Sequence, residues 1–339
     1  MKPSYCAPFK AFATLAVVVR FAWAALLSSF FWTSTSAAQT VIDIATGYPD
    51  SSFHVQNLRQ FAQEVTEASR GELRVEVHAA GSKLKAPEIL QGVISGRVAA
   101  GEVFGPSLSG IHGVFGLDAI PFLATDYVKA RKMWKTVERT VEAELAKKGL
   151  TLLMSVPWPP QGLFSTRPIA TPKDAVGLIM RENSPPVKRL AELIQATPLR
   201  VETPDLANAA KERRIEMVFT SAAQGIDTRL YEPMPYFYRA NAWLPRNVVM
   251  INSASFAKLT KAQQLSLTKL AGRAEERGWL MSEKFAQTST EALAKAGAKV
   301  QPLSLQVQSR LERAGNQIAR EALKAGDPAL LSMMMELLN

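Results

Sequence analysis

The spacing of hydrophobic residues predicts helices and short strands in alternation from residue 41 to residue 219. Apolar side chains three and four positions apart predict helices at 52–69, 87–94 and 185–193, a longer one that begins at Asp126 and is ended by Gly149, and another that begins at Thr203. Short apolar or alternating runs predict strands at 41–45, 73–77, 150–156, 178–181, 199–201 and 215–219. Alternation of this kind is typical of α/β units with largely parallel sheets.

One predicted helix is much longer than the others. Thr260–Ala296 contains no proline and places apolar residues such as Leu267, Leu270 and Ala274 on one face. At 1.5 Å per residue a continuous helix here is about 55 Å long, so we expect it to span two lobes. No flexible linker separates the lobes, which indicates a hinge that the chain crosses more than once. We expect lobe I at 39–162 plus about 250–280 and lobe II at 163–249 plus about 281–339.

The first 38 residues have the pattern of an export signal. A short basic start is followed by the apolar tract Ala11–Trp32 and by small residues that end at Ala38. This order is typical of a secretory signal peptide, with cleavage expected near Ala38. A membrane anchor is the alternative, but Arg20 divides the tract into runs too short to cross a bilayer. We therefore expect an exported, periplasmic protein that does not itself span the membrane.

Composition narrows the class of protein further. The 339 residues include 40 Lys and Arg against 30 Asp and Glu, a net charge of +10. The basic residues are spread along the chain without a cluster, so no nucleic-acid partner is predicted. The single cysteine, Cys6, lies in the signal segment, which leaves the exported part without a disulfide or a thiol nucleophile.

A search for catalytic motifs finds none. His54, His78 and His112 are too far apart in sequence for the paired histidines of a zinc protease. The glycines of 110–116 have the wrong spacing for a dinucleotide site and predict a loop. The sequence therefore predicts no catalytic residue, no cofactor and no metal site, although absent motifs do not exclude an enzyme.

Polar residues follow several of the predicted strands. Arg181 and Asn183 come between a strand and a helix, Gln161 follows the strand at 150–156, and Thr220 and Ser221 follow the strand at 215–219. In open α/β sheets, ligands bind beyond the carboxyl ends of the strands. An arginine beside the start of a helix can receive an anion, although an ion pair within the protein is an alternative role for it.

Several segments, taken in order, resemble one known family. Asp118–Leu123 reads D-A-I-P-F-L, similar to a D-x-x-P-F-L segment, and Arg167–Arg181 resembles the signature P-I-x-T-P-x-D-L-K-G-L-K-I-R. Phe61–Val65 and Gly71–Val77 are similar to an opening helix and strand. From about 41 to about 300 the chain resembles the substrate-binding proteins of tripartite ATP-independent periplasmic (TRAP) transporters, dicarboxylate-binding type.

The resemblance implies a two-lobed α/β fold like that of type II periplasmic binding proteins, with hinge strands and a long helix across both lobes. It implies closure on a small organic anion, usually a carboxylate, which is delivered to a small and a large membrane permease subunit. Arg181 stands in the place of the carboxylate clamp. Many members carry a further arginine where this chain has the neutral Gln161, so a monocarboxylate or a hydroxy or oxo acid is as compatible as a dicarboxylate.

We therefore predict an anion site between the lobes, with Arg181 holding the carboxylate through two parallel hydrogen bonds. The other predicted ligand contacts are Asn183, Gln161, Thr220, Ser221, Trp158, Phe219, Trp243, Asn247 and Glu102. Core packing is an alternative role for Trp158 and Phe219. Two alternative functions stay open: an exported receptor for an ABC importer or a sensor, and an exported enzyme.

Overall fold

The computed structural model describes residues 1, 3, 4 and 39–324. Nearly all of the expected signal peptide, including Ala38, lies outside the described residues, so its cleavage stays a prediction. The described residues from 40 to 324 belong to one compact unit by their internal contacts, and the fold described here is that of this unit. Between residues 39 and 324, no helix has both the length and the apolar composition that crossing a membrane requires.

The first of two sheets has five strands. In spatial order they are β2 (Leu73–His78), β1 (Thr40–Thr46), β3 (Ala100–Phe104), β10 (Arg246–Asn252) and β4 (Leu150–Pro157). β1 pairs in parallel with β2 and β3, whereas β10 runs antiparallel to β3 and β4. Helices around this sheet are α2 (Phe53–Ala68), α3 (Ile89–Ile94), α4 (Tyr127–Ala146) and α8 (Ser253–Ala257).

The second sheet has six strands. They are β11 (Lys299–Gln301), β9 (Tyr236–Tyr238), β5 (Gln161–Ser165), β8 (Met217–Ser221), β6 (Ile179–Glu182) and β7 (Thr197–Arg200). β6 is parallel to β7 and β8, but β5 is antiparallel to β8 and β9. The helices of this part are α5 (Pro185–Leu193), α6 (Leu206–Lys211), α7 (Ala222–Asp227) and α10 (Leu305–Lys324).

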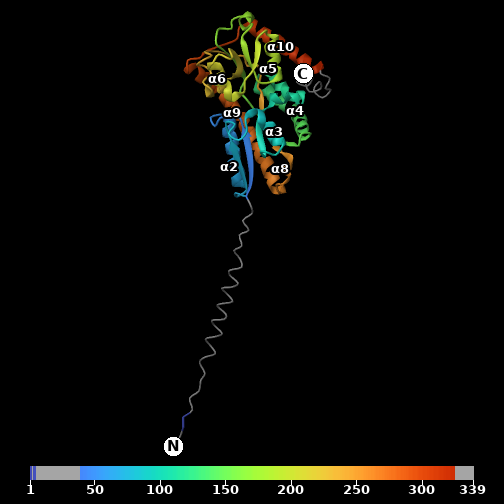
Figure 1. Ribbon diagram of the computed structural model, residues 1–339, viewed down its shortest axis with the longest axis vertical. Helices are drawn as coiled ribbons and strands as arrows, with labels where there is room; N and C mark the ends of the chain where they lie inside the picture. The colour runs from blue at the N-terminus through green and yellow to red at the C-terminus, as the bar shows by residue number, and fades with distance from the viewer. Residues whose placement is uncertain (2, 5–38, 325–339) are drawn as a thin grey trace. The chain divides into compact units, whose positions relative to one another are not determined.

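Helix α9 (Lys261–Lys295) contacts elements of both sheets. It packs against α2 and β4 of the first part and against α7 and β11 of the second. Figure 1 shows α2, α3 and α8 at one end of this unit and α5, α6 and α10 at the other, with α9 between them. Thr260 caps the helix by accepting from the amide of Gln263 at 3.2 Å. The predicted two-lobed α/β fold with a helix across both lobes is confirmed.

The prediction of largely parallel sheets is wrong for the strands next to the crossings. The chain leaves the first sheet at Pro157, enters the second at Gln161, and returns between Tyr238 and Arg246. Strands that carry the chain between sheets run against their neighbours, which makes both sheets mixed. These crossings lie a few residues before the expected boundaries at 162/163 and 249/250, and the lobe ranges themselves stay a prediction.

The loop predicted around 110–116 is more regular than expected. Gly105–Gly110 and Gly113–Ala119 form 3₁₀ turns, labelled η3 and η4, and both pack against α5. His112 caps η4 through its Nδ1, which accepts from the amide of Val114 at 3.1 Å. This segment therefore joins the apolar core of the first part to that of the second.

Candidate ligand site between the two sheets

A cavity of about 220 Å³ lies between strand ends of the two sheets. Tyr48, Glu102 and Phe104 line it from the first sheet, and Arg181 and Asn183 from the second. A smaller recess shares four of these five residues and adds Trp158, Gln161, Thr220 and Gln224. The carboxyl ends of β1, β3 and β6 all reach this cleft, as the rule for open α/β sheets predicts.

Arg181 is the buried cation of the cleft, with 4% of its surface exposed. Its Nε donates to the carbonyl oxygen of Val201 at 2.9 Å and its Nη2 to Thr203 Oγ1 at 3.1 Å. Among the described residues no carboxylate oxygen lies within ion-pairing distance of it. Burial lowers the pKa of Arg181 to about 10, although the charge of Glu202 opposes that shift. The guanidinium is therefore a protonated group at neutral pH whose direct partners are neutral.

Glu102 is the buried carboxylate on the opposite wall. Its Oε2 accepts from Thr46 Oγ1 at 2.6 Å, and its Oε1 accepts from Asn247 Nδ2 at 2.9 Å. His54 Nδ1 lies 3.2 Å from the same Oε1. Burial raises the pKa of Glu102, but hydrogen bonds from His54, Thr46 and Asn247 outweigh it and hold the pKa below its ordinary value. The cleft thus presents an ionised acceptor facing the cation.

Close packing of α3 against β3 at Gly101 helps to fix the position of Glu102. Gly101 precedes Glu102 in β3, and a Cβ at this position would come within 2.5 Å of Ile89 and 2.9 Å of Val93 in α3. The absence of a side chain lets α3 lie close over the strand. Glu102 is consequently fixed by both its hydrogen bonds and the position of its strand.

Asn247 supports the cleft from behind. Its Oδ1 accepts from Trp158 Nε1 at 2.8 Å and from Tyr48 Oη at 3.2 Å, and its Nδ2 is engaged with Glu102. Trp158 lines the recess and packs on His54, with ring centroids 4.2 Å apart. Asn247 therefore orients groups that line the cleft and does not line it itself.

Strand β8 separates the other predicted contacts into two groups. Thr220 lines the recess, whereas its neighbours Phe219 and Ser221 do not, because successive side chains of a strand point to opposite faces. Phe219 packs on Trp243 within the apolar core, with their ring centroids 4.9 Å apart. Ser221 Oγ accepts from the amide of Gln224 and caps α7.

Gln161 lines the recess, but its Nε2 already donates to the carbonyl oxygen of Pro159 at 2.8 Å. Of the ten predicted contacts, the structure brings six to the cleft and leaves four outside the lining: Phe219, Ser221, Trp243 and Asn247. Tyr48, Phe104 and Thr203 line the cleft but were not predicted. Thr203 had a detectable signal, since Thr203-Pro204 follows a predicted strand, whereas β3 was missed because Ala100 and Gly101 are weak strand formers.

Comparison with known proteins places the chain in a family context. Residues 44–325 match the model of bacterial extracellular solute-binding protein, family 7 (DctP). DctP6 of Bordetella pertussis, an extracytoplasmic solute receptor binding pyroglutamic acid, is 36% identical in sequence, with a TM-score of 0.86 over 88% of this chain and 99% of that one. DctP7 of the same organism, which also binds pyroglutamic acid, is 30% identical, with a TM-score of 0.87 over 88% and 100%.

A more distant curated relative is the 2,3-diketo-L-gulonate-binding periplasmic protein YiaO of Escherichia coli. It is 24% identical over 275 residues, which is 80% of this chain and 83% of the relative.

Proposed function

Because the chain belongs to family 7 of the bacterial extracellular solute-binding proteins, we propose that it is the periplasmic receptor of a TRAP transporter and that it binds pyroglutamate. The resemblance drawn from the sequence motifs is confirmed by the family match and by the two-lobed fold. The ligand, the contact residues and the permease subunits are the parts that we propose.

The main support for the proposal is that Arg181 is buried without an internal counterion. A buried charge costs several kcal/mol unless it is paired, and the direct partners of this guanidinium are neutral acceptors. Those bonds use Nε and one hydrogen of Nη2, so the outer edge formed by Nη1 and Nη2 is available to a carboxylate. Two parallel N–H···O bonds to a ligand carboxylate would supply the missing counterion.

The opposite wall selects against a second carboxylate. Glu102 lines the cavity there, and an anionic group placed near it would be repelled. The ionised Glu102 instead suits a hydrogen-bond donor on the ligand. Pyroglutamate has one carboxylate at one side of a small ring and one N–H donor within the ring, which matches this pair of walls.

The size of the cleft and its other lining residues agree with a small cyclic acid. A volume of about 220 Å³ is below the roughly 300–1,000 Å³ of pockets for drug-sized ligands. Phe104, Tyr48 and Trp158 supply aromatic surface for the ring. Asn183 and Thr220 supply polar groups for the remaining ligand oxygens, while Gln161 shapes the recess. Two receptors at 36% and 30% identity bind the same acid.

Closure of the lobes around the anion would bury the Arg181–carboxylate pair. The loaded receptor would then deliver the acid to a small and a large permease subunit in the membrane. Uptake of labelled pyroglutamate by vesicles that contain the permease pair should require this protein, and uptake that is equal without it would contradict the delivery step.

Calorimetric titration of the purified protein with pyroglutamate tests the receptor function. We expect saturable 1:1 binding, and a ligand at 100 times its dissociation constant should stabilise the fold by about 2.7 kcal/mol. The γ-lactone analogue, in which an oxygen atom replaces the ring N–H, is the matched ligand control. It keeps the carboxylate but offers no donor to Glu102, so we expect affinity at least about tenfold weaker.

The variant Glu102→Gln provides the reciprocal test from the protein side. It should lower pyroglutamate affinity about 10- to 100-fold, because a charged acceptor contributes about 1.5–3 kcal/mol to a hydrogen bond. It should also narrow the difference in affinity between the lactam, pyroglutamate, and its lactone analogue. Equal binding of both ligands to the wild type would overturn the role of Glu102, and no binding of either would overturn the ligand.

A further inference from the structure

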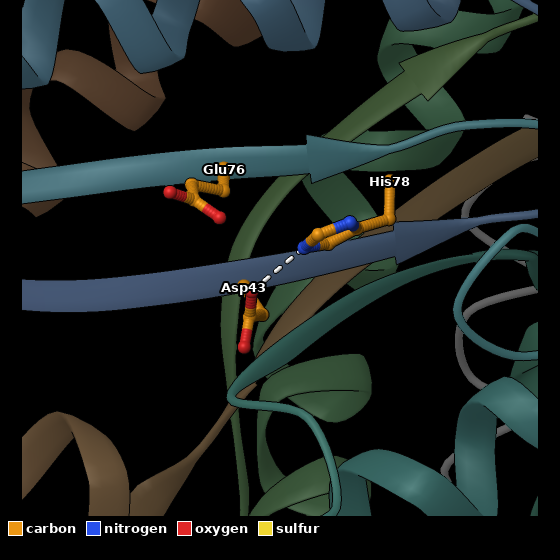
Figure 2. A group of neighbouring side chains, drawn as sticks. All are labelled: Asp43, Glu76 and His78. Carbon is orange, nitrogen blue, oxygen red and sulfur yellow. Dashed lines mark hydrogen bonds and ion pairs between the residues drawn. The ribbon is translucent and has the colours of Figure 1, made fainter.

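Three side chains that could bind a metal, Asp43, Glu76 and His78, lie together on the first sheet, away from the ligand cleft. β1 and β2 are parallel neighbours, and Asp43 is directly opposite Glu76 in the register. His78 is two residues after Glu76, so its side chain projects from the same face of the sheet. Figure 2 shows the two carboxylates and the imidazole turned toward one another.

The ligand atoms are close enough to share one ion. One atom from each of Asp43, Glu76 and His78 lies within 4.8 Å of the others, and His78 Nε2 is 2.7 Å from Asp43 Oδ1. All three residues are half-buried. Sites built on strands are held more precisely than sites on loops. We propose that Asp43, Glu76 and His78 bind a Zn²⁺ ion, with a water molecule in the fourth position.

The donor set favours zinc among the common divalent ions. One imidazole nitrogen and two carboxylate oxygens are ordinary zinc ligands at about 2.0–2.2 Å. Ca²⁺ and Mg²⁺ prefer six or more oxygen ligands and gain little from an imidazole. The direct opposition of Asp43 and Glu76 is also unfavourable without a nearby cation, because like charges across neighbouring strands repel.

Two basic side chains supply that positive charge in the absence of an ion. Lys83 Nζ lies 2.6 Å from Asp43 Oδ2, and Arg74 Nη2 lies 2.9 Å from Glu76 Oε1. Ion pairs this exposed contribute only about 0–1 kcal/mol, so a bound ion can compete with them. These ion pairs involve Asp43 Oδ2 and Glu76 Oε1, so the other carboxylate oxygens, Asp43 Oδ1 and Glu76 Oε2, are available to the metal. Lys83 and Arg74 can therefore stay in place as partners that orient the ligating carboxylates.

Binding requires small local shifts. Two ligand atoms of a tetrahedral zinc site are about 3.4 Å apart for bonds of about 2.1 Å, so His78 and Asp43 must separate by less than 1 Å and the Glu76 oxygen must approach them by up to about 1.4 Å. The hydrogen bond between them is replaced by the ion, and any proton on Nε2 moves to Nδ1 or to solvent. Since β2 is the edge strand of its sheet, the ion would fasten this edge to β1.

None of the three residues lines the ligand cleft, so the proposal is separable from pyroglutamate binding. The test is calorimetric titration of the purified, untagged protein with zinc chloride in a buffer that does not chelate metals. We expect one saturable site and a higher melting temperature with zinc. Titrations with calcium chloride and magnesium chloride should give at least tenfold weaker binding.

His78→Gln and Asp43→Asn should each weaken zinc binding by at least about 30-fold, because each removes a direct ligand. His112→Gln, which removes another half-buried imidazole, and Glu72→Gln, which removes an exposed carboxylate just before β2, are the matched controls. Both should bind zinc within threefold of the wild type. All four variants should keep the circular dichroism spectrum and the pyroglutamate affinity of the wild type.

The absence of a saturable zinc site in the wild type would overturn the proposal. Zinc binding that survives in both His78→Gln and Asp43→Asn would also overturn it, by placing the ion elsewhere. Failure of pyroglutamate binding alone would leave the zinc titration unaffected and would count only against the proposed ligand.

Discussion

Arg181 and Arg246 are buried to the same degree, each with 4% of its surface exposed, but their surroundings differ. Arg246 has a counterion within the protein: its Nε lies 3.2 Å from Asp118 Oδ2, and its backbone amide donates to the same oxygen at 2.8 Å. Its guanidinium also lies 4.7 Å from the ring centroid of Trp134. Arg181 has only neutral hydrogen-bond partners.

The difference separates a structural charge from a functional one. Both arginines lose hydration on burial, and burial lowers the pKa of each. Arg246 recovers that cost within the fold, through Asp118 and Trp134. Arg181 lies at a cavity wall and recovers it only when an anion enters. A buried charge without an internal counterion therefore marks the ligand site better than charge or burial alone.

The largest effect is expected at Arg246. Arg246→Ala would leave Asp118 buried without its partner and should lower the free energy of unfolding by about 3–5 kcal/mol. Urea denaturation measures this loss. Asp118→Leu combined with Arg246→Met replaces the pair by apolar groups and should recover most of the stability. A loss below about 1 kcal/mol in the single variant would remove the distinction between the two arginines.

Arg181→Ala should show the reverse pattern. Affinity for pyroglutamate should fall by about 2–5 kcal/mol, or roughly 30- to 3,000-fold, because the ligand carboxylate loses its buried partner. The free energy of unfolding without ligand should change by about 1 kcal/mol or less, since the cost of burying the charge disappears together with its two hydrogen bonds. Calorimetry and urea denaturation on the same samples measure both quantities.

Two further variants sharpen that result. Arg181→Lys keeps the charge but lacks the planar fork, so it should recover only part of the affinity. Arg167→Ala removes an exposed arginine of the same lobe and should bind pyroglutamate like the wild type. Threefold or smaller loss in Arg181→Ala would show that the carboxylate binds elsewhere.

Glu275, beside the Arg246 pair, gives a pH-dependent test. Burial raises its pKa to about 7, against hydrogen bonds from the amide of Ser155 and from Trp134 Nε1. Because the pKa in the folded state exceeds the unfolded value of 4.5, the folded protein binds more protons between these two values. The stability that this group contributes is present below about pH 4.5 and is lost as the pH rises through about 7.

The free energy of unfolding of the wild type, relative to that of Glu275→Gln, should therefore fall by on the order of 2 kcal/mol between about pH 5 and about pH 8. Urea denaturation across this range measures the difference, and its pH dependence is the informative quantity, since Gln lacks one of the two acceptors. A difference that stays constant with pH would show that Glu275 ionises normally in the folded protein.

The smallest expected effects distinguish two neighbouring residues of β8. Thr220→Val removes a hydroxyl from the recess and should weaken pyroglutamate binding about three- to tenfold. Ser221→Ala removes the cap of α7 and should lower the free energy of unfolding by about 1 kcal/mol, with affinity within twofold. Equal effects of the two variants on affinity would contradict the assignment of these side chains to opposite faces.

Local signals were sufficient for much of the fold. Asp126 was expected to begin a helix, and its Oδ1 accepts from the amide of Lys129 at 2.8 Å at the start of α4. The long helix was expected from residue 260, where Thr260 and Gln263 form a capping box. Signals of this kind lie within a few residues of each other, so the sequence reveals them without knowledge of the fold.

Several strands carried too little local signal. β10 lies between β3 and β4, although about 90 residues or more separate it from both along the chain. Its apolar run Val248–Ile251 was compatible with a strand, but its antiparallel direction depends on where the chain crosses back. The same crossings made both sheets mixed, which periodicity cannot indicate because it describes one segment at a time.

The sequence by itself determined the α/β class, the long bridging helix, the family resemblance and the candidate carboxylate clamp at Arg181. Only the tertiary structure decided that Arg246 has a buried counterion and Arg181 has none, and that Thr220 lines the cleft while Ser221 caps a helix. It alone brought His78 to Asp43 across 35 residues. The reason is physical: helix caps and periodicity act over a few residues, whereas counterions, cavities and shared ligand sites depend on distances between segments that only folding brings together.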